Sequence, residues 1–325
     1  MITNFILAPI LMHLFTAILL LFTLKHIRLQ KIISIVGNFV AFLLCIRLFY
    51  ATDKYNYLIV QVGDWQAPFG IIFVSDTLSS IMTLLTALVS LTVGIYSTAT
   101  INTSRIRFGY FMNFHFLVMG LLGVFLTGDI FNLYVWFEIV IISSFVLLTL
   151  GGKKMQMEGA IKYVSINMLA STIFLTAIGI LYGITGTLNM ADLAIKINQV
   201  ENEGLVSVTA LLFLAGFGIK SAIFPMYFWL PSSYHTPPSA IAAIFGGLLT
   251  KMGVYALIRT FTLIFQPDDF IKTVFIVLAI MTLVTGGLGT INKKSVRRTI
   301  SSISDFSRGS WPPASRRPNR IVRIS

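Results

Sequence analysis

The chain has 325 residues, of which 56% are apolar and only 11% charged, with a mean hydropathy of +0.86 and a formal net charge of +12. A soluble domain of this size cannot bury so much apolar surface, so the composition predicts a polytopic membrane protein. The single cysteine, Cys45, excludes an intrachain disulfide and a Cys-based zinc or iron–sulfur site. We therefore expect no cofactor, no metal centre and no redox chemistry within this chain.

Apolar runs of about 20 residues, the length that crosses about 30 Å of hydrocarbon, predict an all-α membrane bundle of about nine transmembrane helices. The first run has no basic segment before it and is followed by basic residues, the reverse of a cleavable signal peptide. It is predicted to be a retained helix with its N-terminus outside. In chain order the predicted spans are 2–24, 32–50, 72–97, 110–127, 130–150, 160–184, 205–229, 239–262 and 271–291.

The charges between these spans agree with that orientation. Basic residues concentrate in cytoplasmic segments of membrane proteins, and here twelve fall on the predicted inner side against three on the outer side. The sequence thus predicts a multi-pass membrane protein with its N-terminus outside. The inner set is Lys25, Arg28, Lys31, Arg105, Arg107, Lys153, Lys154, Lys162, Lys293, Lys294, Arg297 and Arg298, and the outer set is Lys54, Lys196 and Lys272.

Three ionisable residues, Glu138, Lys220 and Lys251, lie inside predicted spans and away from the span ends. A charge at the bilayer centre costs several kcal/mol, between about 3 and 15 depending on the method, so such residues usually serve a function. The helical rise places Glu138 about 13 Å into the membrane and Lys251 equally deep. The alternative is a structural ion pair between Glu138 and one of the lysines, but buried ion pairs often fail to offset their desolvation. One carboxylate and two ammonium groups therefore predict a proton or cation path.

The segment around Lys220 is unusual for a transmembrane helix. Two glycines precede the lysine, and Pro225, Pro231, Pro237 and Pro238 follow it within eighteen residues. Proline removes a backbone donor and clashes with the preceding turn, so we expect the helix to break or end shortly after Lys220. Irregular backbone at membrane depth is typical of ion and substrate sites.

Other polar residues are weaker candidates. His115 could relay protons, but it could equally form a packing hydrogen bond beside Asn113. His235, in the proline-rich segment, could gate an entrance or be simply solvated, and His13 in the first helix is the weakest of the three. Asp129 could belong to an external ion vestibule, although helix capping is the simpler interpretation. Small hydroxyl residues on the fifth and sixth helices, Ser171 among them, are expected to allow close packing.

The segments TGDIFNLYVWFEIVIISSFVLLTLGG, KSAIFPMYFWLPSSYHTPPSAIAAIFGGLLTKMGVYALIRTFTLIF and GDWQAPFGIIFVSDTLS carry a family resemblance. From the N-terminus to about residue 292 the chain resembles the D subunits of Mrp-type multisubunit sodium/proton antiporters, which are similar to the antiporter-like subunits of respiratory complex I. The resemblance implies that Glu138, Lys220 and Lys251 form a proton half-channel in an inverted repeat whose seventh helix is broken. It also implies exchange of cytoplasmic sodium for external protons, with other membrane subunits and the lipid bilayer as partners and no nucleic acid.

The C-terminal part departs from that family. Members carry about fourteen helices in two inverted repeats, whereas the apolar pattern here ends after the ninth helix, and the segment after Ser301 is rich in Ser, Arg and Pro. We expect either a changed reading frame with a disordered tail or a natural basic tail that binds anionic lipid. The resulting division is 1–109 as an N-terminal three-helix segment, 110–262 as the five-helix repeat, 263–300 as the start of a second repeat and 301–325 as the tail. Alternative functions are a non-transporting assembly subunit and a proton-pumping subunit of a quinone oxidoreductase resembling complex I.

Overall fold

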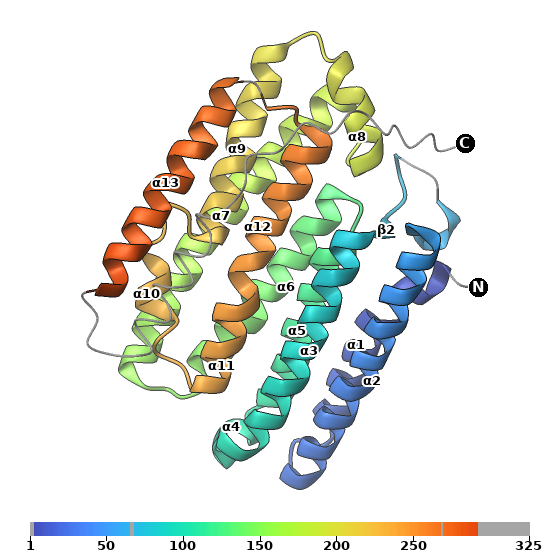
Figure 1. The fold of residues 1–325 in the computed structure, drawn as a ribbon. Coiled ribbons are helices and arrows are strands. Elements are labelled where there is room, and N and C mark those ends of the chain that lie inside the picture. The colour runs from blue at the N-terminus through green and yellow to red at the C-terminus, as the bar shows by residue number, and fades with distance from the viewer. Residues whose placement is uncertain (1–2, 66–67, 268, 292–325) are drawn as a thin grey trace.

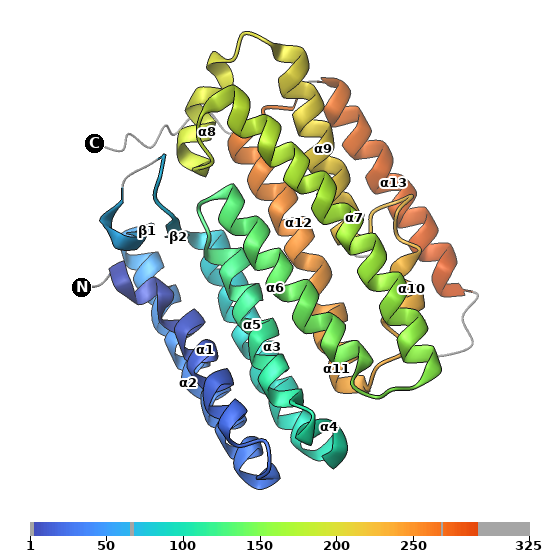
Figure 2. The ribbon, with the colours of Figure 1, turned by 180° about the vertical axis from the view of Figure 1, so that it is seen from behind.

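The computed structural model describes residues 3–65, 68–267 and 269–291, and every structural statement below concerns these residues. They form one elongated bundle of roughly parallel and antiparallel helices (Figures 1 and 2). The predicted tail after Ser301 lies outside the described residues. The elements of the N-terminal part are η1 (Thr3–Leu7), α1 (Ala8–Phe22), α2 (Ile27–Tyr55), β1 (Leu58–Gln61), η2 (Val62–Asp64), β2 (Ile72–Ser75), α3 (Thr77–Thr100) and α4 (Thr103–Arg107).

The remaining elements build the larger part of the bundle. They are α5 (Tyr110–Leu126), α6 (Ile130–Thr149), α7 (Lys154–Thr185), α8 (Met190–Lys196), η3 (Ile197–Gln199), α9 (Glu203–Ser221), α10 (Trp229–Ser233), α11 (Ser239–Ile244), the π-helical η4 (Phe245–Leu249), α12 (Thr250–Arg259), the π-helical η5 (Thr260–Ile264) and α13 (Asp269–Ile291).

Eight helical segments among the described residues are long and apolar enough to cross a membrane. They correspond to eight of the nine predicted spans. The remaining span, predicted at 110–127, is the apolar helix α5 of 17 residues. Nearly every side chain of α5 is buried, because α1, α3 and α6 pack around it. A helix that is apolar on all sides is expected in the centre of a bundle. The structure therefore confirms a polytopic helical bundle with α5 inside it.

The span predicted at 72–97 begins with a strand and not with a helix. Ile72–Ser75 pairs antiparallel with Leu58–Gln61, in a register that places Leu58 opposite Ser75. Both segments are rich in β-branched and aromatic residues, which favour strands. The helix α3 begins only after Asp76, whose side chain accepts a hydrogen bond from Ser79 N in a capping box.

An ion pair ties α3 to the helix that carries Lys251. The two terminal guanidinium nitrogens of Arg259 on α12, Nη1 and Nη2, donate to the two carboxylate oxygens of Asp76, and its Nε donates to Tyr255 Oη at 2.9 Å. Tyr255 Oη in turn donates to the carbonyl of Phe125 on α5 at 2.7 Å. Bidentate pairs of this kind are among the stronger polar interactions in proteins. This network joins the ends of α3, α5 and α12.

We expect Asp76→Asn to lower the stability of the purified chain by about 2 kcal/mol, because Arg259 would keep its charge in a mostly buried position without an oppositely charged partner. Burial alone would raise the pKa of Asp76, but the hydrogen bond and charge of Arg259 outweigh it and hold this pKa below its ordinary value. The stabilisation is therefore present above the unfolded pKa of about 3.9 and is lost as the pH falls through the lower folded pKa. Thermal unfolding between pH 7 and pH 3 measures both effects.

The exposed Asp53→Asn is the matched control, since Asp53 forms none of the ion pairs of the described residues. Equal stability of the Asp76 and Asp53 variants at pH 7 would show that the Arg259 pair contributes nothing.

Candidate functional site

Lys220 lies at the end of a helix in the interior of the bundle. Its side chain is only 2% exposed, and α9 ends one residue later, at Ser221. The next residue, Ala222, adopts the left-handed conformation with φ +54°. The predicted break shortly after Lys220 is thus confirmed, whereas the span predicted at 205–229 is eight residues too long at its C-terminal end.

Neighbouring helices supply partners for the broken backbone. Trp229 Nε1 on α10 donates to the carbonyl of Ile219 at 3.1 Å, and Thr282 Oγ1 on α13 accepts from the backbone N–H of Phe224 at 3.0 Å. Backbone groups that leave a helix within a membrane need such partners, because no water is there to replace them. The break is therefore built into the packing of three helices.

Helix α12 approaches the break very closely at Gly253. A Cβ atom added there would lie 2.5 Å from Ser221 Oγ and 2.8 Å from Ser221 N. Only glycine allows this approach, which places the α12 backbone directly against the end of α9. Lys251 is two residues away on the same helix, so the two lysine-bearing helices meet at this point.

The Lys220 ammonium is held by groups from two other helices. Its Nζ donates to Ser171 Oγ on α7 at 2.9 Å and lies 4.9 Å from the centroid of the Phe137 ring on α6. Ser171 is itself buried. A hydroxyl acceptor and an aromatic face both stabilise an ammonium group without neutralising it.

Glu138 follows Phe137 on α6 and is half-buried. It interacts electrostatically with Lys220, but the described residues contain no ion pair that includes Glu138. Its Oε1 atom is buried and has no hydrogen-bond partner among the described residues. The interpretation of Glu138 as half of a direct structural ion pair with Lys220 or Lys251 is therefore wrong. A buried carboxyl oxygen without a partner can accept a proton or a hydrogen bond from a transported species.

Lys251 is half-buried near the start of α12. Its Nζ donates to the carbonyl of Gly246 at 2.7 Å, inside the π-helical segment Phe245–Leu249. The wider turns of a π-helix leave carbonyl groups available to other donors, and such segments are frequent at functional sites. The sequence contained no signal for this segment beyond the pair Gly246 and Gly247.

His115 has a different partner from the one considered in the sequence. Asn113 donates to the carbonyl of Gly109, whereas His115 Nδ1 lies 2.8 Å from His13 Nδ1 and its Nε2 lies 3.0 Å from Ser34 Oγ. His13, Ser34 and His115 are all fully buried. The histidines therefore join α1, α2 and α5, and no hydrogen bond among the described residues links them to Glu138 or Lys220.

Asp129 and His235 make local contacts. Asp129 Oδ1 accepts from the backbone N–H of Asn132 at 2.8 Å and so caps α6, as the simpler interpretation predicts. Burial raises the pKa of Asp129 above its ordinary value. The Nδ1 atom of His235 lies 2.7 Å from the carbonyl of Pro231, one turn earlier. Their roles as vestibule and gate stay predictions.

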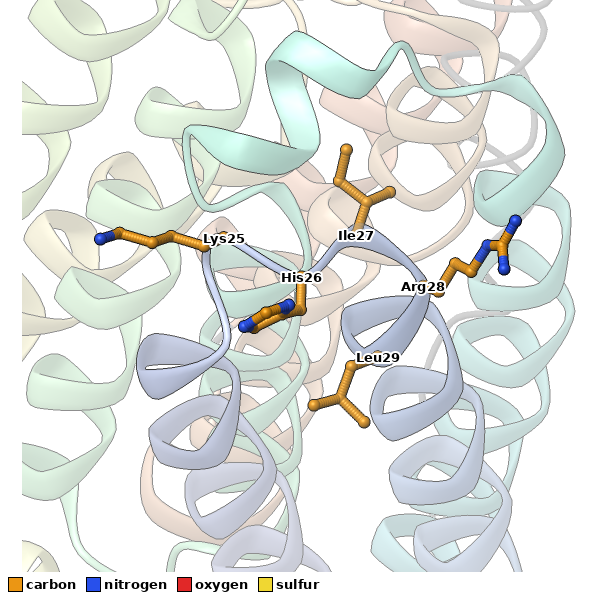
Figure 3. A pocket seen from close by; sticks show the side chains of 5 residues that line it. All are labelled: Lys25, His26, Ile27, Arg28 and Leu29. Atoms are coloured by element: carbon orange, nitrogen blue, oxygen red, sulfur yellow. The ribbon is translucent and has the colours of Figure 1, made fainter.

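Within the part of the chain that the structure describes, no group of three or more His, Cys, Asp or Glu side chains is placed to hold a metal ion. A hollow of about 500 Å³ lies at the turn between α1 and α2, lined by residues 25–29. Its basic side chains, Lys25 and Arg28, point away from each other (Figure 3), and no acidic residue lines it.

Comparison with known proteins places this arrangement in a family. Residues 127–307, more than half of the chain, match the family described as NADH:quinone oxidoreductase/Mrp antiporter, transmembrane. The D subunits of the Na⁺/H⁺ antiporters of Alkalihalophilus pseudofirmus and Bacillus subtilis are each 42% identical to the chain, over 92% and 91% of it. The chain spans about three fifths of the length of these relatives, 61% and 60%.

Solved structures agree with this assignment. A chain of the membrane-bound sulfane sulfur reductase, an archaeal respiratory membrane complex, superimposes with a TM-score of 0.89 at 28% identity, over 94% of this chain and 63% of that one. A chain of the Mrp complex from Dietzia superimposes with a TM-score of 0.85, also at 28% identity, over 94% of this chain and 57% of that one.

We expect Ser171→Ala to destabilise the purified chain by about 1.5–3 kcal/mol, because a buried ammonium would lose its hydrogen-bond acceptor. Ser171→Thr keeps a hydroxyl and should retain most of the stability. Thr172→Ala on the same helix is the control, because Thr172 is exposed and donates only to the carbonyl of Met168. Thermal unfolding in one detergent compares the three variants, and an unchanged Ser171→Ala melting temperature would refute the role of this hydrogen bond.

Proposed function

Since the chain belongs to the NADH:quinone oxidoreductase/Mrp antiporter membrane family, we propose that it is a membrane subunit of a multisubunit sodium/proton antiporter. In this proposal its buried charges carry protons for the extrusion of sodium. The observation that carries the proposal is the unpaired Oε1 of Glu138 next to the helix that presents Lys220 at a backbone break. The antiporter names of the two 42% identical relatives support the choice of cation.

Glu138 and Lys220 act as coupled proton sites in this scheme. They interact electrostatically, yet the ring of Phe137 and the hydroxyl of Ser171 contact the ammonium where a carboxylate could otherwise bind it directly. Protonation of the carboxyl group removes a negative charge near the ammonium, so the lysine then releases its own proton more readily. The proton on one group thereby controls the proton on the other.

Lys251 is the next site along this path. The close approach at Gly253 brings its helix against the end of α9, and the carbonyl of Gly246 accepts a hydrogen bond from its ammonium. Exchange of that carbonyl for another acceptor would let the lysine side chain reorient. We propose that a proton passes from Lys220 to Lys251 across this contact.

The orientation, location and subdivision belong to the same proposal. The basic residues of α4, of the turn before α7 and of the turn between α1 and α2 lie at one end of the bundle, opposite β2 and α8 (Figures 1 and 2). The positive-inside rule makes this end cytoplasmic and places the N-terminus outside, in a bacterial plasma membrane. In this proposal residues 110–262 are the five-helix proton-conducting repeat, residues 1–109 precede it, and 263–300, of which 292–300 lie outside the described residues, begin a second repeat.

A second candidate function is a proton-pumping subunit of a redox-driven complex. The superposition on a chain of an archaeal respiratory membrane complex, with a TM-score of 0.89, favours it. The two candidates differ in their partner subunits. Co-purification with redox subunits and quinone-dependent proton pumping would select the second candidate, and sodium-dependent proton release without redox subunits would select the first.

We expect Glu138→Gln and Lys220→Met each to reduce sodium-dependent proton exchange by about tenfold or more, a barrier increase of about 1.4 kcal/mol. Both substitutions approximately preserve side-chain volume and remove the titrating group. Everted vesicles with an imposed pH gradient, containing the assembled complex, measure the exchange as collapse of that gradient on addition of sodium.

The controls are Glu158→Gln and Lys162→Met on α7. They remove the same charges from a pair that is 63% and 51% exposed. Full exchange activity of the Glu138 and Lys220 variants in correctly assembled complexes would refute their assignment. An assembled wild-type complex without any exchange would instead favour a purely structural subunit.

A further inference from the structure

A polar pocket of about 280 Å³ lies where three candidate membrane spans end or begin. Thr100 at the end of α3, Lys153 before α7 and Ser239 at the start of α11 all line it, together with Arg105 on α4. The short helices α4 and α11 lie at the same end of the bundle in both views (Figures 1 and 2). The pocket is therefore at the level where span ends meet the polar headgroups of a bilayer.

Its two cations, Arg105 and Lys153, have no ion-pair partner among the described residues. Arg105 is half-buried, and burial lowers the pKa of its guanidinium below the ordinary value. The nearby acid Glu158 already pairs with Lys162 at 2.6 Å. The pocket thus keeps two positive charges close together without an acidic residue in its lining.

Gln156 adds a buried polar group to the same pocket. It is 3% exposed, and its Nε2 donates to the carbonyl of Thr236 at 3.3 Å, whereas its Oε1 is buried without a hydrogen-bond partner among the described residues. This oxygen and the Arg105 Nη2 atom converge over Gly151. A Cβ atom at position 151 would lie 2.0 Å from the first and 2.2 Å from the second.

The first turn of α7 completes the charge pattern. Lys153 occupies the N-cap position of this 32-residue helix and provides no side-chain cap. The N-terminus of a long helix carries open backbone N–H groups and a partial positive charge, both of which favour an anion. Two cations without an ion-pair partner and the buried Gln156 thus line one cavity beside the N-terminus of α7.

We propose that this pocket binds the phosphate of an anionic membrane lipid, with Arg105 and Lys153 on the phosphate oxygens and Gln156 Oε1 accepting a hydroxyl of the headgroup. Phosphatidylglycerol carries both features, an anionic phosphate and a glycerol hydroxyl. Basic pockets between helix ends are suited to such headgroups. The position at the ends of three spans favours a lipid over a free phosphate ion.

The bound headgroup links the surface of the bundle to the lysine-bearing helix. Thr236 and Ser239 in the pocket flank the two prolines that join α10 to α11, and α11 continues through η4 into α12 with Lys251. A lipid that contacts α4, α7 and this connection restrains all three. The inference does not depend on the proposed ion exchange, because lipid binding is measured without transport.

The test compares the full chain, purified as isolated from membranes, with the variant R105Q/K153Q by native mass spectrometry. Short-chain phosphatidylglycerol and phosphatidylcholine are titrated separately. Each basic residue near an anionic lipid is worth about fivefold in affinity, so the double variant should bind phosphatidylglycerol about thirtyfold more weakly. Phosphatidylcholine binding should not change.

The control variant R107Q/K154Q removes the same charges from the adjacent exposed positions. It should retain phosphatidylglycerol binding within about twofold, and an equal loss in both double variants would overturn the proposal in favour of a diffuse surface charge. Gly151→Ala keeps all charges but displaces Arg105 and Gln156, so it should also weaken binding. Unchanged binding by Gly151→Ala in a chain of normal thermal stability would overturn the assigned geometry.

Inorganic phosphate at 10 mM provides the last arm of the test. Retention of phosphatidylglycerol in its presence supports a lipid site. Complete displacement of phosphatidylglycerol by inorganic phosphate would show that the pocket recognises free phosphate and would overturn the assignment to lipid.

Discussion

Within hydrocarbon, a backbone that leaves its helix must find hydrogen-bond partners in the protein, and the end of α9 depends on this constraint. Trp229 and Thr282 meet it from two different elements, by an indole donor and a hydroxyl acceptor, and Gly253 lets the α12 backbone pack directly against the same helix end. Because these partners fix the end of α9 at Ser221, they also fix the position of Lys220, the residue before it. The position of Lys220 is therefore a property of the whole bundle and not of α9 alone.

The same constraint explains how the buried charges are distributed. A direct ion pair would satisfy both Glu138 and Lys220, but it would also hold their protons in place. In the structure the ammonium instead contacts the hydroxyl of Ser171 and the face of Phe137, and a carboxyl oxygen of Glu138 stays without a partner. Hydroxyl and aromatic groups lower the cost of burial and leave the charge unchanged. The two groups thus interact electrostatically without forming a direct ion pair.

Much of the fold could be predicted from the sequence because membrane spans depend on length and hydropathy alone. The break after Lys220 was predictable from its prolines, and the capping role of Asp129 from its position before an apolar run. The hairpin Leu58–Gln61 with Ile72–Ser75 was missed because its second strand is as apolar as the helix after it. The π-helical segments, the contact of Lys220 with Ser171 and the pairing of His13 with His115 could not be predicted. They depend on which faces of distant helices meet, and local periodicity does not report this.

The helix that carries Lys251, α12, is held to its neighbours at two points and has a π-helical segment at each end. Gly253 fixes it to the end of α9, and Arg259 fixes it to Asp76 at the start of α3. The π-helical segments Phe245–Leu249 and Thr260–Ile264 flank it directly. Each such segment has i→i+5 hydrogen bonds in place of the i→i+4 bonds of an α-helix, and it therefore rotates the residues that follow it. Because Lys251 donates into the first of these segments, a change in the winding there would move its ammonium relative to Lys220. The coupling that we propose between the two lysines would therefore act through α12 itself.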